Sequence, residues 1–437
     1  MYGSAGMRRK SKKASSPAFH AQEPNMKFIA GVPVMNYHLA YKGSSLSEMQ
    51  RDNVREKWVI VLKPDASDSD INVLCEKGNR CNFFGHPSSG GVPFIEVQGS
   101  EQDLQEMLEH HGEPSAAAGM VEFIEPDLPV RAIPEIHGEP SAAAASWGLE
   151  RVGVAQRNGE GNGAHVYVMD TGIRTTHSDF GGRAIATLDM TSGSTTECNG
   201  AASCAADRDG HGTHCSGTVG GRTYGVAPGA TLHAVKVLSD QGDGDWSWIY
   251  ASLDWIATQG ARPAAASMSL GGGGPLSAVE VAIDAAVSAG VTVVVAAGNE
   301  NDDACNYSPS FVPSAITVGS TDSRDQRSYF SSYGSCTNIW APGSAITSAD
   351  AWGDNDEAVM SGTSMSCPHV SGAVALLLES NPTWTPGQVL QSMLATAEAD
   401  AISGLFSDDT NRLLFVGGGG SPSPQPTPTE APTKQNK

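Results

Sequence analysis

The sequence has no uninterrupted apolar run near the roughly 18 residues that a membrane-spanning helix requires. Basic residues are also scarce, because 27 Lys and Arg stand against 48 Asp and Glu, a formal net charge of −21. Such a chain repels nucleic-acid phosphates and anionic lipid surfaces. We therefore expect no membrane span and no nucleic-acid partner.

A clear signal peptide is also missing. The basic cluster of residues 8–13 is followed by polar residues instead of the apolar segment that a signal peptide contains. The nearest apolar stretch, residues 28–35, is short and is interrupted by Gly31 and Pro33. The cellular compartment must therefore be inferred from other features.

The eight cysteines supply one such feature. Most of them lie in loop-like segments, often close to one another, which is typical of disulfides and of an oxidising compartment. We therefore expect an extracellular or secretory-pathway protein, and the connectivity stays open. Cys215 and Cys367 instead lie in apolar, helix-like stretches, where a buried free thiol is usual. The cysteines expected in disulfides are Cys75, Cys81, Cys198, Cys204, Cys305 and Cys336.

Patterning divides the chain into four segments. Residues 1–57 are polar and turn-rich, which predicts a poorly ordered tail. Residues 58–134 combine short apolar strands with a helix, which predicts a small α+β domain. In residues 135–416 apolar strands alternate with helices, the pattern of an α/β domain with a mainly parallel sheet flanked by helices. Residues 417–437 are rich in Gly and Pro, which predicts a linker or disordered tail.

The expected elements follow from the apolar periodicity. In the small segment they are strands 58–62, 93–97 and 121–124 and helix 103–109. In the large segment they are strands 165–170, 232–238, 265–270, 291–297 and 315–319, and helices 211–219, 246–258, 276–289, 364–379 and 386–397.

One octapeptide, His-Gly-Glu-Pro-Ser-Ala-Ala-Ala, occurs twice, at residues 111–118 and 137–144. A neutral duplication in a tolerant loop explains it. A duplicated processing segment is the functional alternative.

Asp170 and His211 each occupy a position suited to chemistry. Asp170 ends an apolar strand, and parallel sheets bind ligands at the carboxyl ends of their strands, although capping of the next element is a common structural role for such an Asp. His211 lies between Gly210 and Gly212 and suits a general base. A metal site with His214 and Cys215 is the alternative, but the His-Glu-x-x-His motif is absent.

Ser364 begins a predicted helix after Gly362 and Thr363. Small residues there expose the hydroxyl and direct backbone N–H groups outward, which suits both a nucleophile and an anion. A lone serine here would be a helix N-cap. Together with Asp170 and His211, however, it completes the chain order Asp, His, Ser.

The segments around these residues resemble the motifs of the subtilisin-like serine proteases, particularly the proteinase K-like group. They are residues 169–173, 210–214 and 362–369, and the resemblance extends over most of residues 147–400.

The resemblance implies peptide-bond hydrolysis through an acyl-enzyme. Ser364 would attack, His211 would transfer the proton, and Asp170 would orient the imidazole. Asn299 and the Ser364 backbone N–H would donate to the oxyanion. No cofactor is implied for the chemistry.

The resemblance also implies how substrate binds. An extended peptide would pair with a strand on each side, and the small walls of the first pocket would give a broad apolar preference. Trp246 either lines a more distal pocket or is a core aromatic. The substrate-binding residues are Gly242, Gly244, Ser269, Leu270, Gly271, Ala296, Ala297 and Gly298.

A calcium site of the relatives is altered here. Asn338 stands where the proteinase K-like group has an Asp ligand, with the carbonyls of Pro313 and Ala315 as the other ligands. An amide binds a hard cation less well than a carboxylate does, so structural calcium at this position is left open.

Residues 58–134 resemble the family's propeptide, which assists folding, occupies the cleft and is removed by the enzyme itself. Trp147 resembles the start of the mature fold, so we expect cleavage between residues 134 and 146. The sequence thus predicts a monomeric serine endopeptidase, made as a self-processing zymogen with its own propeptide as inhibitor and with proteins and peptides as substrates. A catalytically silent peptide-binding relative and a metalloenzyme are the alternatives.

Overall fold

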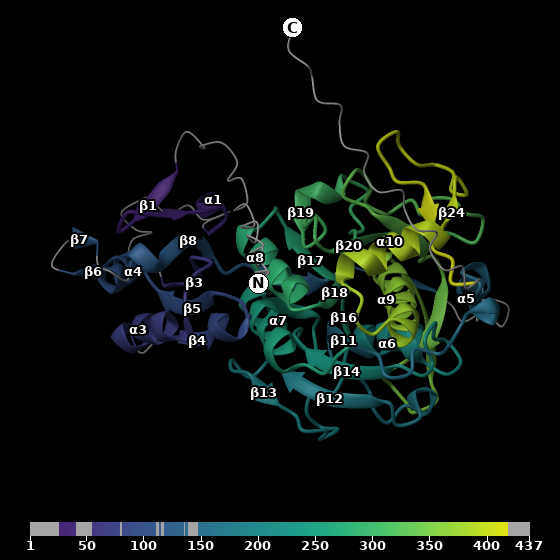
Figure 1. Cartoon of the computed structure of the whole chain (residues 1–437). Helices are drawn as coiled ribbons and strands as arrows, with labels where there is room; N and C mark the ends of the chain where they lie inside the picture. The colour runs from purple at the N-terminus through teal and green to yellow at the C-terminus, as the bar shows by residue number, and fades with distance from the viewer. Residues whose placement is uncertain are drawn as a thin grey trace, which may run out of the picture.

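The computed structural model describes residues 26–40, 55–78, 81–110, 113–114, 118–134, 136–138 and 147–417. Two units lie beside each other, an N-terminal unit of residues 26–134 and a larger unit that begins at Trp147 (Figure 1). The predicted C-terminal tail, apart from Gly417, and most of the processing window, Glu135 and residues 139–146, lie outside the described residues. Within the described ranges, no helix combines the length and the apolar character needed to cross a membrane.

A ten-stranded sheet forms the centre of the larger unit, in the order β13-β12-β14-β11-β16-β18-β20-β21-β25-β24. Neighbours from β12 to β25 are parallel, and only the edge strands β13 and β24 pair antiparallel. The predicted α/β fold is therefore confirmed. The strands are β11 His165–Asp170, β12 Ala184–Asp189, β13 Thr196–Glu197, β14 Thr231–Lys236, β16 Ala264–Met268, β18 Val291–Ala296, β20 Ile316–Thr321, β21 Ile339–Pro342, β24 Glu398–Ala399 and β25 Arg412–Leu413.

Helices bury both faces of this sheet, which is why its central strands are almost continuously apolar. In β11, Val166 and Val168 pack in one apolar cluster, whereas Tyr167 and Met169 pack in a second cluster on the opposite face. Helices α6 and α9 contribute to the first cluster, and α7 and α8 to the second. The helices are α5 Trp147–Arg151, α6 His211–Gly220, α7 Trp246–Gln259, α8 Ser277–Ser288, α9 Thr363–Ser380 and α10 Pro386–Thr396.

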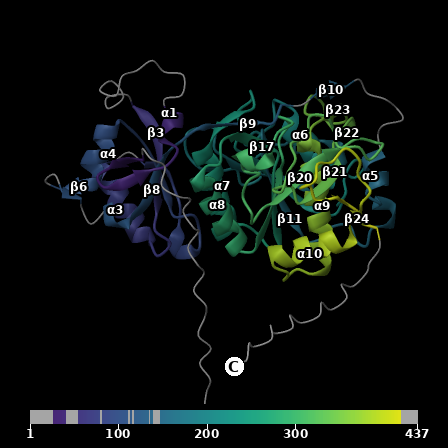
Figure 2. The ribbon, with the colours of Figure 1, turned by 90° about the horizontal axis from the view of Figure 1, so that it is seen from above.

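The N-terminal unit contains a six-stranded sheet in the order β1-β2-β8-β3-β5-β4 (Figure 2). Its elements are β1 Lys27–Ile29, β2 Val32–Val34, α1 Tyr37–Ala40, β3 Glu56–Leu62, α3 Asp68–Gly78, β4 Cys81–Phe84, β5 Phe94–Gly99, α4 Glu101–Leu108, β6 Glu109–His110, β7 Glu113–Pro114 and β8 Val121–Pro126.

Residues 26–40 correct the prediction that all of residues 1–57 form a tail without regular structure. They form β1, β2 and α1, and β2 pairs with β8. The segment escapes a sequence pattern because its two strands are three residues long and are held by tertiary contacts. Ile29, Val32 and Val34 pack into the apolar core of the N-terminal unit.

One face of the N-terminal sheet packs on α7 and α8. Val59, Val61 and Phe123 share an apolar cluster with Ile249 and Leu253 of α7. The ring of Phe94 meets the ring of Tyr250 edge-on, with 5.6 Å between centroids. The two units therefore share one apolar cluster where they meet.

Three smaller sheets lie around the cleft or extend from the core. The four-stranded sheet has the order β15-β9-β17-β19, and a three-stranded sheet has the order β10-β23-β22. Their strands are β9 Pro129–Ala132, β10 Ile136–Gly138, β15 Asp243–Asp245, β17 Leu270–Gly273, β19 Tyr307–Ser308, β22 Ile346–Ala349 and β23 Glu357–Ser361, and β6 and β7 pair with each other.

Candidate active site

Asp170 and His211 lie together at the carboxyl edge of the central sheet. Asp170 is the last residue of β11, and His211 is the first residue of α6. The Asp170 Oδ1 to His211 Nδ1 distance is 2.7 Å, and both side chains are buried. Gly210, the N-cap residue of α6, has φ +115°, a conformation that glycine adopts without strain. The contact fixes the orientation of the imidazole ring.

Asp207, which belongs to none of the sequence motifs described above, organises the turn before α6. Its carboxylate accepts hydrogen bonds from Thr171 Oγ1, at 2.9 Å, and from the backbone N–H and hydroxyl of Thr213. Thr171 Oγ1 in turn accepts from the Gly212 N–H at 2.9 Å. This network ties the end of β11 to the start of α6, so Asp207 positions the pair without touching it.

Ser364 is the second residue of α9 and is fully buried. Pro368 lies four residues later and has no N–H, so the Ser364 carbonyl lacks its helical donor. Ser269 Oγ donates to that carbonyl at 3.0 Å, and the Cys215 thiol does so at 3.4 Å. The first turn of α9 is thereby held against α6 and against Ser269, between β16 and β17.

The Cys215 thiol links the histidine and serine segments. Its Sγ lies 4.0 Å from His211 Nδ1 as well as next to the Ser364 carbonyl. Burial raises the pKa of the Cys215 thiol and raises that of Cys367 to about 12. Both therefore remain protonated at neutral pH, as expected of buried free cysteines.

Asn299 points its amide across the cleft. Its Oδ1 accepts from the backbone N–H and the hydroxyl of Thr363, both at 2.9 Å. Its Nδ2 is thereby directed outward, and it donates to the carbonyl of Pro134 at 2.7 Å. Thr363, which fixes this orientation, was not identified from the sequence. Its position directly before Ser364 was the available signal.

The two predicted substrate-binding strands flank a strand of the chain itself. Strand β9 pairs antiparallel with β15 on one side and with β17 on the other. Gly244 stands opposite Val130, and Gly271 opposite Arg131. The Ala132 N–H donates to the Gly242 carbonyl at 2.9 Å. Residues 129–132 thus occupy the place predicted for an extended peptide.

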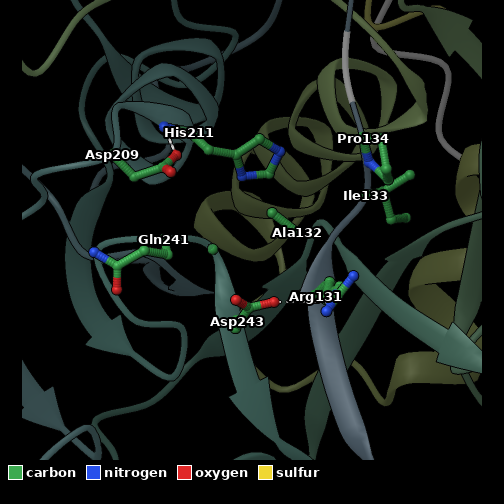
Figure 3. Close-up of a pocket in the computed structure, with 9 residues that line it drawn as sticks. Arg131, Ala132, Ile133, Pro134, Asp209, His211, Gln241 and Asp243 are labelled. Carbon is green, nitrogen blue, oxygen red and sulfur yellow. Dashed lines mark hydrogen bonds and ion pairs between the residues drawn. The ribbon is translucent and has the colours of Figure 1, made fainter.

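Two pockets lie along β9 and the residues that follow it. Ile133, which is buried, and Pro134 line one of them, and its wall includes Leu270, Gly271 and the segment Ala296–Gly298. Ala132 and Pro134 line a second, more open pocket beside His211 and Asp209 (Figure 3). Asp209 Oδ1 accepts from the His211 N–H at 3.2 Å, and burial raises the pKa of Asp209.

Trp246 belongs to the core and also lies behind the cleft. It is buried, and its ring stacks on Tyr250 with 6.3 Å between centroids. Val130 of β9 is buried in the same apolar cluster. The core role and the distal-pocket role are therefore compatible.

The alternative metal site does not gather the three expected ligands. His214 Nε2 lies 3.0 Å from the Ile346 carbonyl, and burial lowers the pKa of His214 to about 3. Among the described residues, the ligand atoms within 4.8 Å of one another belong to Asp170, His211 and Cys215. The protonated thiol of Cys215 and the ion-pair geometry of the other two fit a proton-transfer site better than a metal centre.

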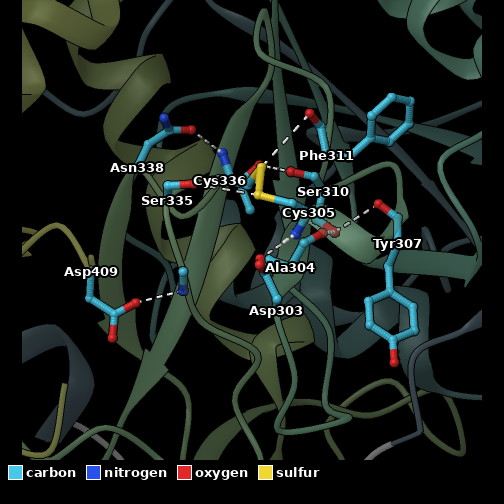
Figure 4. Close-up of a disulfide and its surroundings, with 12 residues drawn as sticks. Asp303, Ala304, Cys305, Tyr307, Ser310, Phe311, Ser335, Cys336, Asn338 and Asp409 are labelled. Carbon is cyan, nitrogen blue, oxygen red and sulfur yellow. Dashed lines mark hydrogen bonds between the residues drawn. A yellow bond between two sulfur atoms is a disulfide. The ribbon is translucent and has the colours of Figure 1, made fainter. Parts of the chain in front are cut away.

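The altered calcium position has a competing contact. Asn338 Oδ1 accepts from the Thr317 N–H at 2.7 Å, beside the disulfide of Cys305 and Cys336 (Figure 4). Its amide oxygen thus already accepts a hydrogen bond from the backbone of β20. These residues fit calcium poorly, and the site at Pro313, Ala315 and Asn338 stays a prediction.

The expected disulfides are confirmed. The bonds join Cys75 to Cys81, Cys198 to Cys204, and Cys305 to Cys336. Cys215 and Cys367 are free and buried, as expected.

Comparison with known proteins decides the family. Residues 161–420 match the Subtilase family. The chain belongs to the subtilase family. It is 44% identical over 305 residues to the extracellular serine proteinase of Thermus sp. (strain Rt41A), over 68% of this chain and 70% of that protein. It is 36% identical over 381 residues to the cuticle-degrading protease of Metarhizium anisopliae, over 83% and 90% of the two chains.

Solved structures agree with this assignment. This subtilase aligns with a cold adapted subtilisin-like serine proteinase at a TM-score of 0.58 and 41% identity, over 62% of this chain and 98% of that chain. Fervidolysin from Fervidobacterium pennivorans aligns at a TM-score of 0.69 and 21% identity, over 85% and 61% of the two chains, which supports the fold alone. The protein is a subtilisin-like serine endopeptidase that acts on proteins, and its chemistry needs no cofactor.

Proposed function

We propose that this endopeptidase is made as a zymogen and that its own cleft cuts the Pro134–Glu135 bond. The observation that carries the proposal is the 2.7 Å hydrogen bond from Asn299 Nδ2 to the Pro134 carbonyl. A donor at that oxygen stabilises the negative charge that develops when the carbonyl is attacked. The chain on both sides of the bond supports the same assignment.

On the N-terminal side, β9 lies between β15 and β17. On the C-terminal side, the backbone of β10 pairs antiparallel with β23, and Ile136 stands opposite Ser361, three residues before Ser364. The described strands before and after Glu135, β9 and β10, are therefore both extended, as a substrate peptide in the cleft would be. Pro134 lies at the start of the predicted processing window.

The proposed reaction uses the buried groups described above. Ser364 Oγ attacks the Pro134 carbonyl carbon while its proton passes to His211 Nε2, and Asp170 keeps the proton of His211 on Nδ1. Asn299 and the Ser364 backbone N–H hold the oxyanion. The new amine leaves with the proton from His211, and water then attacks the acyl-enzyme by the same route, which regenerates Ser364.

The same site would cut other proteins with a broad apolar preference. The pocket lined by Pro134, the residue before the proposed cut, and by Ile133 is walled by Leu270, Gly271 and the small residues Ala296 to Gly298. We propose residues 58–134 as the propeptide domain, extended at its N-terminal end by residues 26–40, which share its sheet, and residues 135–416 as the catalytic domain. The propeptide acts as an intramolecular inhibitor of a monomeric enzyme.

An extracellular location agrees with three disulfides and with the extracellular Thermus relative. We place the mature enzyme there.

Expression of the wild-type chain beside Ser364→Ala tests the proposal. Intact masses and N-terminal sequencing should show a new N-terminus at Glu135 in the wild type only. Ser366→Ala, two residues along the same helix, is the matched control and should still be cut. An uncut wild-type chain, or a Ser364→Ala chain cut at the same bond, would contradict self-processing.

A further inference from the structure

Strand β15 places two carboxylates at the edge of the cleft. Asp243 and Asp245 are two residues apart, so their side chains lie on the same face of the strand. Each pairs with a basic side chain of the N-terminal unit, Asp243 with Arg131 and Asp245 with Lys57. Departure of that unit removes both cations from the cleft.

The Asp243 pair is set by the strand register. Asp243 and Arg131 stand directly opposite each other across β15 and β9, and Asp243 Oδ1 lies 2.8 Å from Arg131 Nε (Figure 3). The two side chains are 54% and 72% exposed. No apolar wall encloses a group this exposed, so its recognition rests on charge.

Nearby charges do not replace Arg131. Asp209, on the other side of the same pocket, is also acidic. Asp240, in the turn before β15, pairs with Arg208 and Lys236. In the described part of the chain, Arg131 is therefore the cation that pairs with Asp243.

We propose that Asp243 makes the enzyme favour substrates with Arg or Lys at the position that Arg131 holds in β9. The inference rests on the proposed function, because it takes β9 as the substrate strand. A basic side chain there would pair with Asp243 across the two strands. An acidic one would face a like charge directly opposite, which is unfavourable.

Peptides with the sequence of residues 127–138 provide the test, with Arg, Lys, Gln or Glu at position 131. They are cut by the mature enzyme obtained from the full chain. We expect kcat/KM to be about fivefold to tenfold higher for Arg than for Glu at low salt, because the attraction of the exposed Arg pair and the repulsion between Glu and Asp243 add in this ratio. The ratio should shrink at high salt. Asp243→Asn should bring the ratio within about twofold.

Asp245→Asn is the matched control, since it removes the same charge from the same strand without touching Arg131. In Asp245→Asn the ratio of kcat/KM for the Arg peptide to that for the Glu peptide should stay at its wild-type value. A wild-type ratio near one, a ratio unchanged in Asp243→Asn, or an equal loss in both variants would each overturn the assignment while leaving peptide hydrolysis intact. Failure to cut any of the peptides would overturn the proposed function as well.

Discussion

The N-terminal unit contacts the catalytic unit in two different ways. At the helix starts, Glu125 accepts from the Ser277 and Ala278 N–H groups at the beginning of α8, and Asp127 accepts from the Ser247 N–H at the beginning of α7. In the cleft, by contrast, the contacts are the edge pairing of β9, the exposed Arg131 ion pair and the bond from Asn299 to Pro134.

The contacts at the helix starts hold the N-terminal unit in place, whereas the contacts in the cleft present the proposed cleavage site. Acidic groups at helix starts accept hydrogen bonds from unpaired N–H groups and interact favourably with the helix dipole, whereas burial opposes the ionised form of Glu125. These contacts lie outside the segment that would be cut. The apolar packing of Phe94 on Tyr250 adds to them. Cutting after Pro134 would therefore break the chain at the weaker contact and leave the N-terminal unit bound.

Among the changes proposed here, Asn299→Ala should have the largest effect, and it should act on the contacts in the cleft by lowering the rate of cleavage. Removing one oxyanion donor in subtilisin lowers kcat by about 10²–10³-fold, and we expect a similar loss here. Binding of the N-terminal unit should change little, because the contacts at α7 and α8 remain. The rate of appearance of the cut chain and kcat on a peptide give the measurement. Asn355→Ala, in an exposed loop, is the control. A fall of less than about threefold would remove Asn299 from the proposed role.

The pH dependence of stability tests the contact that Glu125 makes at the start of α8. Burial raises the pKa of Glu125 to about 7, from 4.5. The folded chain then holds more protons than the unfolded chain between these values, so this stabilisation is complete below pH 4.5 and is lost as the pH rises to about 7. The free energy of unfolding should fall by roughly 3 kcal/mol as Glu125 ionises over this pH range.

Urea unfolding of the uncut Ser364→Ala chain at pH 5 and pH 8 measures the effect. Glu125→Gln in that background should reduce the dependence and leave the part that Asp127 carries, because burial raises the pKa of Asp127 to about 7 as well. Glu122→Gln, on the same strand, should preserve the full dependence. Equal pH slopes for all three chains would show that Glu125 does not carry the effect.

Asn36→Ala should have the smallest effect of the three, and it tests the contact of the N-terminal unit with the start of α8. Asn36 Nδ2 donates to Glu125 Oε1 at 2.7 Å and to the Pro275 carbonyl at 3.3 Å, so the β1–α1 segment supports the helix-capping contact. Loss of these bonds should lower the unfolding free energy of the uncut chain by about 1 kcal/mol. The same urea titration measures it, with exposed Asn72→Ala as control. If the unfolding free energies of Asn36→Ala and Asn72→Ala are equal, the β1–α1 segment does not support the contact of Glu125 with α8.

The local sequence pattern was sufficient to predict the ends of a helix or strand where specific residues begin or terminate it. Strand β11 was predicted with both of its ends, because its apolar run stops at Asp170 before Thr171 and Gly172. The start of α10 was also predicted, and the structure shows a capping box of Thr385 and Gln388 with Pro386 in the first turn.

Tertiary partners decided the rest. Strand β9 reads Pro-Val-Arg-Ala, which has no strand periodicity, and it is extended because β15 and β17 offer their edges. Asp207 and Thr363 act through hydrogen bonds to segments distant in the sequence, which spacing does not reveal. The catalytic roles of Asp170, His211, Ser364 and Asn299 were proposed from motif order. The structure adds the distances from Asp170 to His211 and from Asn299 to the Pro134 carbonyl, which the order does not contain.

The position of β9 has a kinetic consequence. If the chain is cut after Pro134, the new carboxyl terminus lies where the next substrate must enter, so the first product is also a competitive inhibitor at high effective concentration. Proteolytic activity should then appear after a lag whose length depends on dissociation or destruction of the N-terminal fragment. Added mature enzyme should shorten the lag, because destruction of that fragment is bimolecular.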